Sequence, residues 1–315
     1  MEVVLAKPRG FCAGVVRAVE IVEQALDLYG PPIYVLHQIV HNQEVIRDLE
    51  ERGVVFTEDL ESIPQGALTI FSAHGVAQDV VETAEQLGLK AINATCPLVT
   101  KVHFQAQKHS QQGREIIIIG HRDHVEVRGT LGQLNGPAQV VATTEEAENL
   151  EVADPEHLAY VTQTTLSLDD TRDVVSTLKR RFPAIQGPEL SGICYATQNR
   201  QNAVGDLAGE ADLLLVVGSR NSSNCARLRE VGERHGLPAY LVEDADDIQE
   251  SWLQGSGRIG LTSGASTPEV LVNRVLDRLR DLGADSVREM EGETETTTFR
   301  VPLAEIQSAQ PHARD

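Results

Sequence analysis

The stretch IIIIGHRDH, residues 116–124, is an apolar run that ends in polar side chains, and this arrangement occurs three times in the chain. It occurs earlier as PIYVLHQIVHN, residues 32–42, and later as LLLVVGSRNSSN, residues 213–224. Each time a second short apolar run follows, then an acidic stretch, then a third apolar run that again ends in polar residues. Short runs rich in Val, Ile and Leu are typical of buried strands. The sequence therefore predicts three copies of one structural unit.

Stretches with helical spacing of apolar residues separate these runs, and several of their ends are marked. Residues 15–28 show this spacing and stop at Gly30. Asn42 and Ser167 are positioned as N-caps, and Pro268 marks the start of the last long helix. Strands that alternate with helices predict a parallel α/β fold. We expect three similar α/β units followed by a polar tail that lacks the repeat, with these ranges: 1–96, 97–193, 194–281 and 282–315.

Composition and charge argue against two classes of partner. The chain has 47 acidic and 27 basic residues, a formal net charge of −20, and no basic stripe of the kind that binds nucleic acid. No apolar run approaches the ~18 residues that span a bilayer, and the N-terminus lacks a signal-peptide pattern. We therefore expect no nucleic-acid partner, no membrane association and, with four cysteines, a cytoplasmic location with reduced thiols.

Three of the four cysteines occupy the same place in successive units. Cys12, Cys96 and Cys194 each lie at a predicted strand-to-helix junction. The amide dipoles of a helix N-terminus favour the thiolate form of a cysteine. The repeat predicts that these three thiols meet at one centre. Cys225 has no counterpart in the other copies, so we interpret it as a helix residue.

Three readings of the cysteine trio stay open from spacing alone. A lone cysteine in a core usually acts as a small hydrophobe, so the three can be unrelated core thiols. A zinc site is a second reading, although structural zinc sites normally show short C-x-x-C pairs and this chain has none. An iron–sulfur cluster is the third, and three thiolates would leave one iron of a cubane open for chemistry.

Polar loops follow the predicted strands, and ligands of open α/β sheets bind beyond the carboxyl ends of strands. Simple helix capping predicts the same short polar residues but does not explain why loops of all three copies present donors at one rim. Glu126, two residues after a histidine at a strand end, is the acid best placed to donate a proton if it is desolvated. The other residues expected at this rim are His41, His74, His124, Thr164, Ser222, Ser223, Asn224 and Ser266.

A set of motifs in order along the chain resembles the family of 4-hydroxy-3-methylbut-2-enyl diphosphate reductases, the last enzymes of the non-mevalonate isoprenoid pathway. The resemblance covers residues 3 to about 300. One departure is HVEVRG at residues 124–129, where the family often has His-Pro-Glu-Val-Glu-Gly. The motifs are GFCAGV (10–15), HQIVHN (37–42), SAHGV (72–76), ATCP (94–97), TQTTLS (162–167), CYAT (194–197), GSRNSSN (218–224) and GASTP (264–268).

The resemblance implies a pseudo-threefold trefoil around one central [4Fe–4S] cluster held by Cys12, Cys96 and Cys194. It implies reduction of the substrate to isopentenyl and dimethylallyl diphosphate, with electrons from a donor such as ferredoxin or flavodoxin. Glu126 is implied as the proton donor, and Thr164 as a neighbour of the substrate hydroxyl. The residues implied to hold the diphosphate are His41, His74, His124, Ser222, Ser223, Asn224 and Ser266.

Two other functions are consistent with these residues. A hydro-lyase would use an open iron only as a Lewis acid and would work without a reductant. A cluster-bearing sensor or scaffold protein would have no high-affinity diphosphate site. Activity without a reductant and the effect of diphosphate on the melting temperature distinguish these functions from a reductase.

Overall fold

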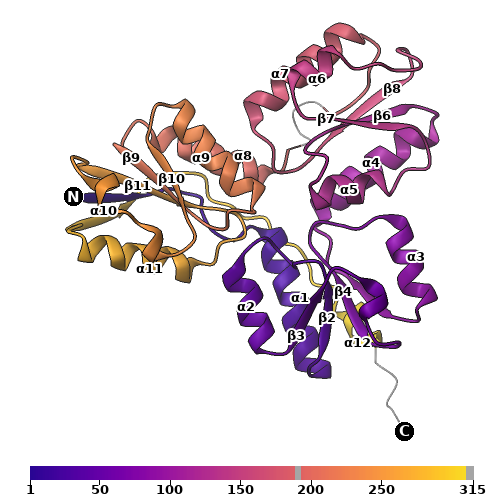
Figure 1. Cartoon of the computed structure of the whole chain (residues 1–315), viewed down its shortest axis with the longest axis horizontal. Helices are drawn as coiled ribbons and strands as arrows, with labels where there is room; N and C mark the ends of the chain where they lie inside the picture. Colours follow the sequence, from indigo (N-terminus) through magenta and orange to yellow (C-terminus); the bar gives the residue numbers. More distant parts are fainter. Residues whose placement is uncertain (189–192, 310–315) are drawn as a thin grey trace.

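The computed structural model describes residues 1–188 and 193–309, and in this part of the chain three parallel sheets form three lobes around a common centre (Figure 1). The strands carry apolar side chains on both faces, as parallel strands covered by helices do. Among the described residues, no helix is both long enough and apolar enough to cross a membrane. The predicted α/β class and the three units are confirmed.

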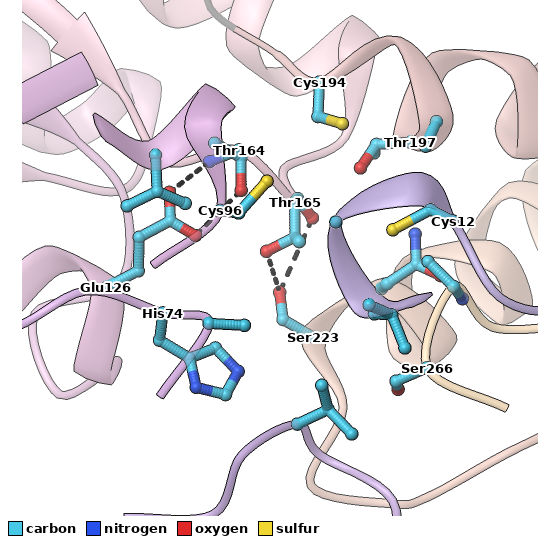
Figure 2. Close-up of a pocket in the computed structure, with 18 of the residues that line it drawn as sticks. Cys12, His74, Cys96, Glu126, Thr164, Thr165, Cys194, Thr197, Ser223 and Ser266 are labelled. Atoms are coloured by element: carbon cyan, nitrogen blue, oxygen red, sulfur yellow. Dashed lines mark hydrogen bonds between the residues drawn. The ribbon is translucent and has the colours of Figure 1, made fainter. Parts of the chain in front are cut away.

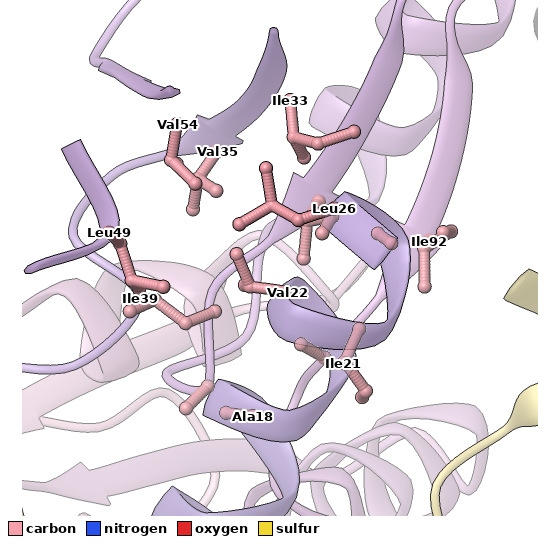
Figure 3. Close-up of a cluster of buried hydrophobic side chains, with 14 of the residues drawn as sticks. Ala18, Ile21, Val22, Leu26, Ile33, Val35, Ile39, Leu49, Val54 and Ile92 are labelled. Carbon is pink, nitrogen blue, oxygen red and sulfur yellow. The ribbon is translucent and has the colours of Figure 1, made fainter. Parts of the chain in front are cut away.

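The first lobe is a four-stranded sheet in the order β3-β2-β4-β5. Helix α1 packs on it and buries Ile21 and Val22 against strand residues such as Ile33 and Val35 (Figure 3). The elements of this lobe are α1 (Ala13–Tyr29), β2 (Ile33–Leu36), α2 (Gln43–Glu51), β3 (Val54–Thr57), η1 (Leu60–Ser62), β4 (Leu68–Phe71), α3 (Gln78–Gln86) and β5 (Lys90–Asn93).

The second lobe is a three-stranded sheet in the order β7-β6-β8, and an isolated parallel bridge joins Ala159 to Gln186. The bridge places residue 186 where a fourth strand would lie. The elements are α4 (Pro97–Gln111), β6 (Glu115–Ile119), α5 (Val125–Leu131), β7 (Ala138–Val141), α6 (Thr144–Glu148), β8 (Leu158–Thr162) and α7 (Leu168–Arg181).

The third lobe is a five-stranded sheet in the order β10-β9-β11-β1-β12. Two of its strands come from the ends of the chain. The elements are α8 (Tyr195–Leu207), β9 (Leu213–Val217), α9 (Ser223–Arg234), β10 (Ala239–Val242), η3 (Ala245–Asp247), α10 (Glu250–Leu253), β11 (Arg258–Ser263), α11 (Glu269–Asp281), β12 (Ser286–Glu289) and β1 (Glu2–Leu5).

The place of β1 differs from the prediction, which assigned residues 1–96 to the first unit. The strand pairs in parallel with β11 and β12, and Val3 and Val4 are fully buried there. The sheet orders give the reason. Strand β1 lies beside β11 as β5 lies beside β4, so the N-terminus supplies the fourth strand of the third copy. A short apolar strand does not reveal in its sequence which sheet it joins.

The tail, predicted as residues 282–315, contains β12 and a short helix, α12 (Leu303–Ser308); its residues 310–315 lie outside the described part. Helix α12 packs on the first lobe. Ile306 is fully buried in the core of that lobe, and the Tyr29 hydroxyl donates to the Ile306 carbonyl at 2.5 Å. The described part of the tail therefore runs from the third lobe back to the first.

Local signals in the sequence place the ends of several helices correctly. Gly30 is the C-cap of α1, with a φ of 70° that favours glycine. The Asn42 side chain accepts from two backbone N–H groups of α2, and the Ser167 hydroxyl accepts from one backbone N–H of α7. Pro268 is the N-cap of α11. Because each capped helix follows the carboxyl end of a strand, the loops gather on the side of the sheets that faces the centre.

Candidate functional site

A single cavity at the centre of the three lobes is lined by every residue that the sequence singled out for a site. Its volume is about 110 Å³. Loops from all three sheets contribute, and the side chains point inward (Figure 2). The predicted residues that line it are Cys12, His41, His74, Cys96, His124, Glu126, Thr164, Cys194, Ser222, Ser223, Asn224 and Ser266.

The three cysteines hold equivalent backbone positions. Cys12, Cys96 and Cys194 are the N-caps of α1, α4 and α8, and none of their side chains caps its own helix. The Cys96 N–H donates to the Ala73 carbonyl at 3.0 Å. In the same way the Cys194 N–H donates to Thr164 O at 3.2 Å, and the Cys12 N–H donates to a carbonyl of the loop after β11. Each cysteine loop is thus tied to the loop that follows the third strand of one copy.

Gly14, in the first turn of α1, brings the backbone close to two of the thiols. A Cβ at this position would lie 2.6 Å from Cys96 Sγ and 3.8 Å from Cys12 Sγ. The first distance is shorter than any ordinary contact, so a larger residue would displace the Cys96 sulfur. The glycine allows these two sulfurs, from different loops, to face the same space.

Burial opposes ionisation of two thiols. It raises the pKa of Cys96 to about 11 and that of Cys194 to about 12, although backbone N–H groups of the following helix turns act in the opposite direction. The helix N-termini favour the thiolate as expected from the sequence, but for these two thiols desolvation is the larger effect when no cation is bound. A metal group that binds here must displace protons.

Cys225 lies apart from the trio, as interpreted from the sequence. It belongs to α9, is fully buried in a hydrophobic cluster of the third lobe, and does not line the cavity. Its sulfur packs against Gly218 and Gly264, where a Cβ would lie 2.5 Å and 2.2 Å from it. This packing gives Cys225 a structural role.

The donor set of the cavity fits an iron–sulfur cluster better than a single ion. In residues 1–188 and 193–309, no three His, Cys, Asp or Glu side chains converge closely enough to hold one metal ion. Yet three cysteines from three loops line one cavity. Separated thiols around a common space suit a polynuclear cluster, in which each cysteine binds a different iron. Zinc, the second reading of the trio, needs all its ligands at about 2.0–2.3 Å from one point.

Three histidines form a compact cluster on one wall of the cavity. The His41 and His74 rings stack with centroids 4.1 Å apart, and the His124 ring stands edge-on to them at 5.7 Å and 6.2 Å. Burial lowers the pKa of each ring, to about 4 for His124 and well below 6.5 for His74, whose neighbouring histidines add to the effect. We call His41, His74 and His124 the cavity histidines. The lowered pKa values favour the neutral form of all three rings in the free protein.

The tautomer of His124 follows from its place in the helix cap. Its Nδ1 accepts from the Glu126 backbone N–H at 3.2 Å at the start of α5. A neutral imidazole that accepts at Nδ1 carries its proton on Nε2. That Nε2 is buried and has no partner in the described residues. It is a donor without an acceptor, as an anion-binding site requires.

Glu126 is held by the loop after β8. Its carboxylate accepts from the Thr164 backbone N–H at 2.7 Å and from the Thr164 hydroxyl at 2.8 Å (Figure 2). The side chain is only 2 % exposed. Burial raises the pKa of Glu126 to about 7, although both bonds from Thr164 favour the charged form. This carboxyl is therefore poised to donate a proton near neutral pH.

The loops of the third lobe add hydroxyl and amide groups. Ser222 caps α9, and Ser223 bonds through its hydroxyl to the Thr165 hydroxyl at 3.1 Å (Figure 2). Asn224 Oδ1 accepts from the Ala265 N–H at 2.9 Å, which leaves its buried Nδ2 without a described partner. The Ser266 hydroxyl donates to the His41 carbonyl at 3.0 Å. Together with the cavity histidines, these groups form a wall of neutral donors.

Two further threonines line the cavity that sequence reasoning missed, Thr165 and Thr197. Both lie inside motifs that were quoted for their neighbours, one beside Thr164 and the other three residues after Cys194. Threonine is common in capping and turn positions, so its residue type alone carries little functional signal.

The buried Arg200 on α8 ties two cysteine-bearing loops together. Its Nη2 donates to the Gly10 carbonyl at 2.8 Å, just before α1, and its Nη1 donates to the Ala196 carbonyl at 2.9 Å in the first turn of α8. The tail supplies its counter-ion, since Glu295 lies 2.9 Å from Nη1. The side chain of Arg200 is fully buried. A single cation thus fixes the relative positions of α1, α8 and the tail.

Comparison with known proteins agrees with this geometry. The family described as "LytB protein" matches residues 3–280. The chain is 55% identical over 306 residues to the 4-hydroxy-3-methylbut-2-enyl diphosphate reductase of Pseudomonas putida strain GB-1, covering 96% of this chain and 97% of that protein. It is 58% identical over 301 residues to the enzyme of the same name from Bordetella pertussis, covering 96% and 93%.

A solved structure shows the same architecture. The E-1-hydroxy-2-methyl-but-2-enyl-4-diphosphate reductase from Plasmodium falciparum matches with a TM-score of 0.93 and 38% identity, over 97% of both chains. The sequence motifs, the three-lobed fold and these relatives lead to one assignment. The chain belongs to the LytB protein family, the family of the 4-hydroxy-3-methylbut-2-enyl diphosphate reductases.

Proposed function

We propose that this protein catalyses the reductive dehydroxylation of 4-hydroxy-3-methylbut-2-enyl diphosphate. Two electrons and two protons remove the hydroxyl as water, and the products are isopentenyl and dimethylallyl diphosphate. The observation that carries the proposal is one cavity that combines three cysteines, a buried carboxyl with a pKa of about 7, and two buried donors without a described partner, on His124 and Asn224. The reductases named among its relatives support the same reaction class.

In this proposal Cys12, Cys96 and Cys194 hold one [4Fe–4S] cluster. When bound, the cluster supplies Lewis acidity and a route for electrons. The three helix N-termini hold the thiol groups toward the cavity, and the amides of those turns offset part of the thiolate charge. Because thiol ligands must stay reduced, the reaction suits the cytoplasm.

The diphosphate is held without lysine or arginine in the cavity wall. His124 offers Nε2–H and Asn224 offers Nδ2–H, both buried and without a described partner. The N-terminus of α9, which begins at Ser223, adds free backbone N–H groups and a positive helix end. These local donors offset the formal charge of −20, which repels an anion from the molecule as a whole. His41, His74, Ser222, Ser223 and Ser266 complete the binding wall.

Glu126 delivers a proton to the reacting carbon or oxygen. Its pKa of about 7 allows it to be protonated before the reaction and to ionise during it. The Thr164 hydroxyl donates to the carboxylate at 2.8 Å and orients the acid, and its oxygen can accept a hydrogen bond from the substrate hydroxyl. The cavity histidines, with lowered pKa values, gain protons as the diphosphate enters.

The test begins with anaerobic purification and counts of iron and sulfide, for which a cubane requires about four of each per chain. Turnover of the hydroxylated substrate is then measured with reduced methyl viologen, and a Cys12→Ser variant serves as the cluster-deficient control. We expect turnover only with the reductant and only in the loaded wild type. Equal activity without a reductant would identify a hydro-lyase. An iron-free protein whose melting temperature diphosphate does not raise would refute the proposal.

A further inference from the structure

Helix α4 is a local exception to the acidic charge of this protein. From Gln86 to Arg114 the sequence contains no aspartate or glutamate, although the chain carries a formal net charge of −20. Two of its five lysines, Lys101 and Lys108, lie on α4, and both are exposed. Neither forms an ion pair with any described residue, whereas most exposed arginines of this chain do. Their positive charges are therefore available to a partner.

An exposed aromatic ring lies between the two lysines. Phe104 is 64 % exposed, the largest fraction among the exposed large hydrophobic side chains of the described chain. Helical spacing places residues 101, 104 and 108 on one side of the helix, because neighbours three and four apart share a face. We call Lys101, Phe104 and Lys108 the α4 face. Exposed aromatic side chains, Phe among them, are enriched in protein interfaces, and charges around them steer a partner of opposite charge.

The α4 face borders a groove that reaches a cysteine of the central cavity. The groove, of about 270 Å³, lies between the first turns of α4 and α8. Cys194 lines both this groove and the central cavity. Helix α4 begins at another cysteine, Cys96, which is its N-cap. Two of the three cysteines therefore lie at the inner end of a surface that carries unpaired positive charge. The groove is lined by Leu98, Lys101, Val102, Gln105, Ile193, Cys194, Tyr195 and Gln198.

We propose that the α4 face and the adjoining groove dock an acidic one-electron carrier protein, which passes its electrons to the enzyme at Cys194. The inference rests on the proposed function, which needs an external source of two electrons. Each docking event oxidises one carrier by one electron, so two carriers are oxidised for each hydroxyl that leaves as water with two protons. An acidic carrier is repelled by most of this protein, and a local positive face therefore sets both its orientation and its association rate.

The test compares two reductants in the same enzyme. One is a reduced [2Fe–2S] ferredoxin of net negative charge, and the other is reduced methyl viologen, a small molecule that needs no docking face. The variants are Lys101→Glu with Lys108→Glu, and Phe104→Ala. Their matched controls are Lys179→Glu on α7, an exposed lysine of the same lobe, and Leu28→Ala on α1, which is 49 % exposed.

With ferredoxin we expect kcat/KM to fall at least about tenfold in the double charge variant and severalfold in Phe104→Ala, with both controls near wild type. Rising salt should slow the wild type with ferredoxin and should have little effect on the charge variant. With reduced viologen all variants should match wild type, with unchanged iron content and melting temperature.

The two reductants separate failure of the inference from failure of the function. Equal rates of wild type and charge variant with ferredoxin would overturn the docking site, and so would an equal loss with both reductants. If the loaded wild type does not turn over with reduced viologen, the proposed function itself is wrong.

Discussion

Replacement of Glu126 by glutamine tests the link between burial and proton donation. The folded protein raises the pKa of Glu126 from 4.5 to about 7. Below pH 4.5 the carboxyl is protonated in both the folded and the unfolded states and has no effect on stability. As the pH rises, the unfolded state loses its proton first, so the free energy of unfolding falls until the folded carboxyl also ionises near pH 7. The ionisable Glu126 carboxyl therefore destabilises the folded state increasingly between pH 4.5 and pH 7, and this penalty is absent at low pH.

The size of this effect follows from the shift. At 1.36 kcal/mol per pKa unit, the penalty above pH 7 is about 3 kcal/mol, of which about 2.5 kcal/mol develops between pH 5 and pH 8. Glutamine does not ionise and retains an oxygen that accepts from the Thr164 N–H. The stability of Glu126→Gln relative to wild type should therefore rise by about 2.5 kcal/mol from pH 5 to pH 8. Any constant change in hydrogen bonding cancels in this difference.

The assay is urea unfolding of the iron-free wild type and variant at several pH values, with Glu85→Gln on α3 as an exposed control. In the loaded enzyme, the same variant should keep its iron but lose about 10²–10⁴-fold in turnover. Wild-type turnover should decline above pH 7, because the acid must be protonated. A relative stability that stays constant from pH 5 to pH 8 would contradict the desolvation argument, and unchanged turnover would contradict the role as proton donor.

Three further predictions address the cluster, the tail and the substrate. Cys225→Ser should retain the full iron content in an elemental assay, because this thiol lies in the third lobe's core, and lost iron would show that the ligand set is wrong. Arg200→Gln should lower the free energy of unfolding by about 3–5 kcal/mol in urea titrations, because it leaves the Glu295 carboxylate without its counter-ion. The double variant with Glu295→Gln should recover part of this loss. If the losses of stability in the two single variants simply add, the Arg200–Glu295 ion pair does not stabilise the fold. Binding of diphosphate should take up protons at pH 7, because the anion raises the lowered pKa values of the cavity histidines. Calorimetry in two buffers of different ionisation enthalpy measures this uptake. An equal binding enthalpy in both buffers would show that no protons are taken up.

The composition of the cavity was predictable because it depends on local rules that the repeat presents three times. Loops after parallel strands lie at one edge, and caps such as Asn42 and Ser167 are visible as residue types. Once the strands are recognised, the loops that carry His74, Glu126 and Ser222 are each placed at the carboxyl edge of a sheet, and the equivalent cysteines of the three copies predict that these edges face one centre. The roles of these residues still depend on the resemblance and on the experiments above.

Other features depend on contacts between segments far apart in the sequence. Nothing near Arg200 indicates that a glutamate 95 positions later neutralises it. The pKa values of Cys96 and Cys194 depend on how completely the three lobes exclude water, which opposes the helix N-termini that the sequence does reveal. Strand β1 joins the third sheet because it takes the position beside β11 that β5 takes beside β4 in the first sheet. Long-range packing overrides local expectation in each of these cases.

The pairing of strand β1 with the much later strands β11 and β12 has a consequence for synthesis on the ribosome. Strand β1 (Glu2–Leu5) is synthesised before every other described element, but its partners β11 and β12 follow only after residue 257 has been made. At about 5–20 residues per second, Val3 and Val4 wait for tens of seconds before they can be buried. The first two lobes can assemble in that interval, whereas the loop of Cys12 is fixed only after the last strands emerge. Insertion of the cluster is therefore expected to follow the synthesis of β11 and β12, so that iron delivery acts on a chain in which all three lobes are present.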